Sequence, residues 1–152
     1  PEATFTSSGT TGNEVSRHRV ADLSLYRESF TRTFSIFYGS PSDYCILALL
    51  PSYLERSGSS LVFMVDELIR QTGNPDSGFY LNQLYALTEK LSALDRSGQK
   101  TILIGVSFAL LDLAERFTFN LQNTIIMETA RYRYTITIQL GSGRYEVNKA
   151  KR

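Results

Sequence analysis

Residues 100–106 read Lys-Thr-Ile-Leu-Ile-Gly-Val, a strongly apolar run that is rich in β-branched side chains. Such side chains favour strands, and a run that is apolar at consecutive positions is typical of a strand with both faces buried. Strands of this kind lie inside parallel sheets whose two faces are covered by helices. The run therefore predicts a central strand of an α/β sheet.

The segments on either side of this strand have the apolar spacing of helices. On its N-terminal side, leucines recur at helical spacing over residues 84–94, and Ser97-Gly98 marks the end of that helix. On its C-terminal side, residues 108–117 predict a second helix, with Ser107 near its N-cap. Residues 60–69 predict a third helix, earlier in the chain.

Two further apolar runs predict strands. Residues 44–50 are continuously apolar up to Pro51, residues 123–129 form a similar run after the second helix, and residues 79–81 add a short strand. Strands that alternate with helices of this length are joined by crossover connections and lie parallel in one sheet. We therefore predict an α/β fold, with a mainly parallel sheet flanked by helices, over residues 1–130.

An amphipathic helix is predicted over residues 20–38, ahead of the first of these strands. Large aromatic side chains recur along it, and we expect them to pack in the core. They are Phe30, Phe34, Phe37 and Tyr38. A helix that begins at residue 20 would place its N-terminus, and the positive end of its dipole, just past a hydroxyl-rich segment near the start of the chain.

That segment, Thr6 to Gly12 (TSSGTTG), carries five hydroxyls and two glycines. Glycines let the backbone approach a ligand closely, and unpaired N–H groups together with hydroxyls can converge on one anion. Arg17, His18 and Arg19 follow, and they can reinforce anion binding through charge-assisted hydrogen bonds. The segment has the chemistry of a phosphate-binding loop, although the same composition is also typical of flexible linkers.

Composition indicates a soluble globular domain. The chain has 152 residues, of which 42% are hydrophobic and 20% charged, and its formal net charge of +1 gives no reason to expect nucleic acid or an anionic membrane as partner. No signal peptide or membrane-spanning run is visible. The single cysteine, Cys45, is expected to be an inert buried thiol in a reduced, cytoplasmic compartment. The chain begins at Pro1 rather than Met, which suggests an excerpt or a processed product.

Residues 5–12, FTSSGTTG, look like the phosphate loop of the adenylate-forming superfamily, which includes acyl-CoA synthetases and related ligases. The segment is not a Walker A motif, because no lysine occupies the position that this motif requires. The superfamily loop usually continues with Pro-Lys, whereas this chain has Asn13-Glu14. Another cation must take the place of that lysine, and Arg17 or His18 is the candidate.

Later segments are similar to the acyl-protein synthetase branch of this superfamily, which is typified by the synthetase of the bacterial bioluminescence fatty-acid reductase. They are Ser16-Arg17-His18, residues 47–56 (LALLPSYLER), residues 104–110 (IGVSFAL) and Met127-Glu128-Thr129. The resemblance covers residues 5–129. It implies that residues 1–130 are part of the large domain of such an enzyme.

The resemblance implies a two-step reaction. A fatty or aryl carboxylate attacks the α-phosphate of ATP to give an acyl-adenylate and pyrophosphate, and a thiol of CoA or of a protein cysteine then takes the acyl group. Backbone N–H groups, cationic side chains and Mg²⁺ would neutralise the leaving pyrophosphate.

The implied site residues are Arg17 and His18 for catalysis, Ser7, Ser8, Gly9, Thr10, Thr11 and Gly12 for holding the phosphates, and Pro51, Ser52, Tyr53, Gly105, Val106 and Phe108 for the acyl pocket. Ordinary packing at strand ends is the alternative for the last six.

The sequence departs from the superfamily pattern after Thr129. The paired glycines, the Tyr-Gly-x-Thr-Glu element, the ribose-binding aspartate and the C-terminal lysine are not present, and Cys45 does not match the acyl-accepting cysteine. We therefore expect the chain alone to be catalytically incomplete. A non-catalytic nucleotide- or partner-binding module that retains the loop is the alternative.

Residues 131–152 form a locally basic tail with a different pattern. Residues 131–140 alternate polar and apolar side chains, and residues 141–143 read Gly-Ser-Gly. This alternation, followed by a turn and a return strand at residues 144–147, predicts a C-terminal β-hairpin.

Overall fold

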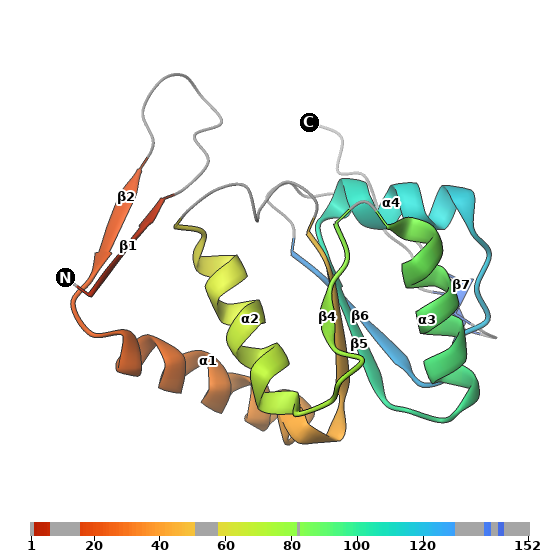
Figure 1. Ribbon diagram of the computed structural model, residues 1–152, viewed down its shortest axis with the longest axis horizontal. Coiled ribbons are helices and arrows are strands. Elements are labelled where there is room, and N and C mark those ends of the chain that lie inside the picture. The colour runs from red at the N-terminus through yellow and green to blue at the C-terminus, as the bar shows by residue number, and fades with distance from the viewer. Residues whose placement is uncertain are drawn as a thin grey trace.

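The computed structural model describes residues 2–6, 16–50, 58–81 and 83–129, together with residues 139–140 and 143–144. Its centre is a four-stranded parallel sheet with the strand order β4-β3-β5-β6 (Figure 1). The strands are β3 (Cys45–Leu49), β4 (Gly78–Phe79), β5 (Thr101–Gly105) and β6 (Thr124–Glu128). The predicted α/β fold with a parallel sheet is confirmed, and the central strand is β5.

Helices cover both faces of this sheet, with α1 and α2 on one face and α3 and α4 on the other (Figure 1). The chain moves from β3 to β4 in one direction along the sheet and from β4 through β5 to β6 in the other. Right-handed crossovers therefore place α2 on the opposite face from α3 and α4. The helices are α1 (Leu23–Tyr38), α2 (Ser60–Thr72), α3 (Leu84–Arg96) and α4 (Ser107–Arg116), with a short 3-10 helix η1 (Pro41–Asp43) before β3.

The helices at 60–69, 84–94 and 108–117 are confirmed, with small shifts at their ends. Ser107 is the first residue of α4 and Val106 occupies the N-cap position, with no side-chain cap. The N-terminal turn of α4 is closed by backbone alone, because the N–H groups of Ala109 and Leu110 both donate to the Val106 carbonyl at 3.0 Å.

The core lies where the two central strands meet the helices. Every residue of β3 and β5 is buried, which is why both read as continuous apolar runs in the sequence. The helices contribute a second set of buried apolar side chains. They are Phe30 and Phe34 from α1, Val65 and Leu68 from α2, Leu87, Leu91 and Leu94 from α3, and Ala109, Leu110 and Leu113 from α4.

One of the four aromatic side chains expected in the core is not there: Phe37 is 74% exposed. The buried row of α1 follows every fourth residue, with Tyr26 and Phe30 at 5.3 Å and Phe34 and Tyr38 at 5.2 Å between ring centroids. Since Tyr38 occupies the last position of this row, Phe37 lies beside it and faces solvent.

The predicted start of the first helix at residue 20 is wrong. Residues 17–20 form a strand, β2 (Arg17–Val20), which pairs antiparallel with β1 (Ala3–Thr6), and α1 begins only at Leu23. Asp22 is the N-cap, and its side chain accepts a hydrogen bond from the Ser24 N–H at 2.7 Å. Pairing with β1 therefore places Val20 in a strand rather than in the predicted helix.

Near the C-terminus, β7 (Gln139–Leu140) pairs antiparallel with β8 (Gly143–Arg144). The longer strands predicted over residues 131–140 and 144–147 otherwise lie outside the described residues. None of the helices in the described ranges has the length and hydropathy needed to cross a membrane.

Cys45, the first residue of β3, is fully buried, as predicted. Burial raises the pKa of its thiol, and the Ser77 hydroxyl donates to its Sγ at 3.8 Å. Because the thiolate is the reactive form, we expect Cys45 to react with a chromogenic thiol reagent only after unfolding. A Ser42→Cys, Cys45→Ala variant, which presents its thiol at an exposed position, is the positive control. Full labelling of Cys45 under native conditions would contradict the prediction.

Candidate functional site

The strand order creates a switch point between β3 and β5. These neighbouring strands are parallel and in register, with Leu49 opposite Gly105. The chain leaves the C-terminal end of β3 toward α2 on one face and that of β5 toward α4 on the other face. In open α/β sheets, ligands bind in the crevice where two such connections diverge. The carboxyl edge at β3 and β5 is therefore the first candidate site.

The described residues of the expected acyl pocket lie at this edge, but their side chains differ in exposure. Val106 is 4% exposed and belongs to the core, whereas Phe108, in the first turn of α4, is 58% exposed. Gly105 ends β5, and its carbonyl accepts from the Thr129 N–H at 2.9 Å and the Thr129 hydroxyl at 3.3 Å. Only Phe108 of these residues therefore presents a large side chain to a ligand at the edge.

The other three residues expected in the acyl pocket, Pro51, Ser52 and Tyr53, lie outside the described residues. They follow Leu50, which is fully buried directly after β3. Their relation to the carboxyl end of β3 is therefore known only from their place in the sequence.

Glu128 was not among the expected site residues, yet it ends β6 directly opposite Gly105. One of its carboxylate oxygens, Oε1, is buried and has no hydrogen-bond partner within the described part of the chain. Buried polar atoms in proteins are nearly always paired, so an orphan at the carboxyl edge is a reason to consider the residue functional. An acidic residue at the end of an apolar strand was the available signal in the sequence.

The second candidate region is the β1–β2 hairpin. The proposed phosphate-holding residues Ser7, Ser8, Gly9, Thr10, Thr11 and Gly12 lie outside the described residues. The two ends of their segment are nevertheless defined, because Thr6 at the end of β1 pairs with Arg17 at the start of β2. The last residue of β1 and the first residue of β2 therefore lie side by side at one end of the hairpin.

Arg17 and His18 are both exposed, and they are consecutive residues of a strand. Side chains alternate along a strand, so these two point to opposite faces of the hairpin. Arg17 shares its face with Arg19, and His18 shares the face of Phe5, its partner on β1. A ligand on one face of the hairpin can therefore contact Arg17 or His18, but not both.

The N-terminus of α1 is not available to a phosphate, contrary to expectation. The Ser24 N–H donates to Asp22, and the Leu23 N–H donates to Oε2 of Glu2 at 2.8 Å. Hydrogen bonds from Ser24 stabilise the ionised form of the Asp22 carboxyl and lower its pKa. Two carboxylates at this helix end would repel a bound anion.

The helix end that adjoins Thr6 is that of α2. The Thr6 N–H donates to the Gly58 carbonyl at 2.8 Å, and Gly58 directly precedes Ser59, the N-cap of α2. The Ser59 hydroxyl accepts from the Val62 N–H at 3.3 Å. The last described residue before the hydroxyl-rich segment is thus bonded to the backbone one residue ahead of the α2 N-cap.

Aromatic packing fixes this contact. The Phe5 ring is buried between Tyr26 of α1 and Phe63 of α2, with centroid distances of 5.4 and 5.7 Å. The Tyr26 hydroxyl in turn donates to the Ser60 carbonyl at 3.3 Å. The hairpin is therefore joined to the helix pair through side chains as well as backbone.

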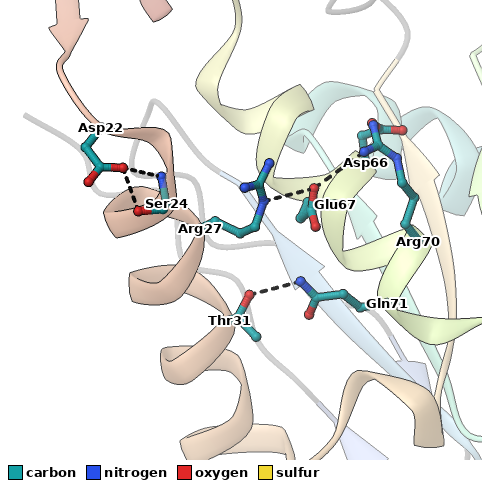
Figure 2. A network of polar contacts seen from close by, with 8 residues as sticks. All are labelled: Asp22, Ser24, Arg27, Thr31, Asp66, Glu67, Arg70 and Gln71. Carbon is teal, nitrogen blue, oxygen red and sulfur yellow. Dashed lines mark hydrogen bonds and ion pairs between the residues drawn. The ribbon is translucent and has the colours of Figure 1, made fainter. Parts of the chain in front are cut away.

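A third region is the open groove of about 500 Å³ between α1 and α2. Figure 2 shows that its charged groups face one another: Nε of Arg27 lies 3.2 Å from Oε2 of Glu67, and Gln71 donates to Thr31 at 3.1 Å. The other lining arginine, Arg32, lies 3.9 Å from Glu28. Because each of these cations already has a carboxylate beside it, we interpret the groove as a solvated seam between helices.

Within the described ranges, no group of three or more His, Cys, Asp or Glu side chains could hold a metal ion. We therefore assign no protein ligand to Mg²⁺. No protein-family model, curated protein or solved structure matches the chain.

Proposed function

We propose that this chain is an AMP-forming acyl-activating ligase, or the large-domain portion of one. In this proposal, residues 7–12 hold the polyphosphate of ATP, and a carboxylic acid is activated at the carboxyl edge of the sheet. The observation that carries it is the bond from the Thr6 N–H to Gly58, which joins the start of the hydroxyl-rich segment to the backbone just ahead of α2.

The chemistry fits this arrangement at two points. Pyrophosphate departure needs hydrogen-bond donors and positive charge, which the N–H groups and hydroxyls of residues 7–12, together with Arg17 or His18, would supply. The helix dipole of α2 adds a favourable field for an anion near its N-terminus. ATP is the substrate here, and Mg²⁺ would supply further neutralising charge while bound to its phosphates.

The carboxylate substrate would lie at the carboxyl edge of the sheet, where the connections that follow β3 and β5 diverge. Phe108 offers an exposed apolar surface for a fatty or aryl chain, and Pro51, Ser52 and Tyr53 follow the neighbouring strand. The acyl group would then pass to a thiol outside this chain, because Cys45 is fully buried in β3. The C-terminal β-hairpin over residues 131–152 stays a prediction.

The test is to replace Thr10 and Thr11 together with alanine. ATP at about 100 times its Kd should stabilise the unmodified chain by about 2.7 kcal/mol, and the double variant should lose that stabilisation. Thermal unfolding of the unmodified chain and of the double variant, each with and without ATP, measures the stabilisation and its loss. The matched control is Ser29→Ala, Thr33→Ala, which removes two hydroxyls from the exposed face of α1. It should keep the full response.

Pyrophosphate release distinguishes the enzyme from a binding module. With ATP and a fatty or aryl carboxylate, release by the chain or by a longer protein that contains it supports the ligase, whereas ATP-dependent stabilisation without release from either supports a non-catalytic module. An unmodified chain that ATP does not stabilise would contradict both.

A further inference from the structure

The carboxyl edge of the sheet contains a carboxylate that the chain leaves without a partner. Oε1 of Glu128, at the end of β6, is buried and accepts no hydrogen bond, and none of the ion pairs in the described ranges involves this residue. We propose that Glu128 is a specificity-determining residue whose carboxylate binds an ammonium group on the carboxylic-acid substrate. This inference rests on the proposed function, because it names the class of acid that the chain would activate.

Glu128 lies on the face of the sheet that α3 and α4 cover. Successive side chains of a strand point to opposite faces, so Glu128 shares its face with Thr124 and Ile126. The Thr124 hydroxyl donates to Asp95 of α3 at 3.2 Å, and Ile126 lines a small apolar cavity together with Leu110 of α4. The carboxylate is therefore on the side of the sheet where α4 begins.

The neighbours of Glu128 on this face offer it no side-chain donor. Beside it on β5 is Gly105, which has no side chain, and Leu110 covers that glycine so closely that an added Cβ would lie 2.7 Å from the leucine. On the other side of β6 the described sheet has no further strand. Glu128 as a whole is only half-buried, so a ligand at this edge can reach its carboxylate and supply the missing donor.

The charge of the carboxylate indicates the chemistry of that donor. A neutral donor would satisfy the hydrogen bond alone, whereas an ammonium group also supplies the opposite charge, and such charge-assisted bonds are roughly twice as strong. Buried charges in proteins are paired with an opposite charge or bind a metal. Within the described ranges no cluster of three or more potential metal ligands exists, which favours an organic cation.

The position of Glu128 also indicates where the ammonium group lies on the acid. The acid to be activated is placed where the connections after β3 and β5 diverge, and β5 lies between β3 and β6. Neighbouring strands are about 4.8 Å apart, so that crevice is about 5–10 Å from β6. An amino group next to the carboxylate would not span this distance. We therefore expect an acid whose amino group is at the far end of its aliphatic or aryl chain.

Three small acids test this expectation. In ε-aminocaproate the ammonium group is at the far end of the chain, heptanoate has a methyl group of similar size in its place, and norleucine is the isomer with the amino group beside the carboxylate. Calorimetric titration without ATP measures the Kd of each. The unmodified chain should bind ε-aminocaproate about 10- to 100-fold more tightly than the other two, the usual contribution of a hydrogen bond between charged groups.

Glu128→Gln should abolish this preference, because it keeps the shape of the side chain and removes its charge. It should weaken ε-aminocaproate binding by about 10- to 100-fold and leave heptanoate binding unchanged. The thermal stability of the ligand-free variant should not fall, since Oε1 has no partner to lose. Glu115→Gln is the matched control, because it makes the same exchange at an exposed residue near the other end of α4. If Glu128→Gln does not fold, Glu128→Asp, which withdraws the carboxylate by one methylene, should show the selective loss in its place.

The outcomes separate this inference from the function on which it rests. An unmodified chain that binds ε-aminocaproate no better than heptanoate or norleucine overturns the role of Glu128, as does a Glu128 variant that weakens ε-aminocaproate and heptanoate equally. Pyrophosphate release from ATP with heptanoate but not with ε-aminocaproate would also overturn it, while the ligase stands. If ε-aminocaproate binds through Glu128 but neither the chain nor a longer protein that contains it releases pyrophosphate with any of the three acids, the ligase is wrong and the ammonium site stands.

Discussion

Replacing Asp95 with alanine should lower the free energy of unfolding by about 1.5–3 kcal/mol, because it removes the hydrogen bonds that two backbone N–H groups donate to a buried carboxylate. Asp95 lies in the last turn of α3 and is 8% exposed. Its side chain accepts from the Gln122 N–H at 3.0 Å and the Asn123 N–H at 2.7 Å, and from the Thr124 hydroxyl at 3.2 Å. These groups lead into β6, so the loss should loosen the edge strand as well as α3.

Urea denaturation measures this effect, and Asp112→Ala is the matched control. Asp112 is an exposed acidic residue of α4 whose partner is Arg116, at 2.6 Å and four residues further along. Exposed pairs of this kind contribute about 0.3–0.5 kcal/mol, so the control should be nearly neutral. If both variants lose the same small amount, the Asp95 carboxylate does not hold the α3–β6 junction.

The sheet could be predicted from the sequence because β3 and β5 are buried at every position. A strand covered on both faces leaves a run of consecutive apolar residues, which is a local signal. The helices α2 and α3 could also be predicted, because their buried residues recur at helical spacing, which is again a local signal. Helix ends were less certain, since α4 begins at Ser107 without a side-chain cap.

The hairpin could not be predicted, because its cause is not local. β2 consists of Arg17, His18, Arg19 and Val20, which carry no alternating apolar pattern and are mostly exposed. They form a strand because β1 lies beside them, and β1 is fixed by Phe5 against two helices. Thr6, the last described residue before the hydroxyl-rich segment, is accordingly bonded next to the start of α2 and not to the helix that follows the segment in sequence.

The position of Asp95 in the last turn of α3 could have indicated its tertiary contact from the sequence. An acidic side chain in the last turn of a helix opposes the helix dipole, so it is unfavourable unless something compensates. Here the compensation is the set of N–H donors from the connection to β6. A carboxylate placed against the dipole therefore indicates a tertiary partner.

The second large effect is expected at Gly105, the last residue of β5. A Cβ there would lie 2.7 Å from Cγ and Cδ2 of Leu110, which is 1% exposed in the first turn of α4. Since the leucine has no free space to enter, Gly105→Ala should destabilise the fold by about 1–3 kcal/mol, the usual result of overpacking. The absence of a side chain at Gly105 is thus explained by packing alone.

A double-mutant cycle tests that explanation and separates it from a role in substrate binding. Leu110→Ala alone should cost about 2–5 kcal/mol because it leaves a cavity. In Gly105→Ala, Leu110→Ala the new methyl group enters the space that the leucine vacates, so the combined loss should be smaller than the sum of the two. Strict additivity in urea denaturation would show that the two side chains do not compete for one space. A double variant that regains stability but no longer releases pyrophosphate would mean that the acyl substrate also needs the glycine, because packing would then no longer account for the loss.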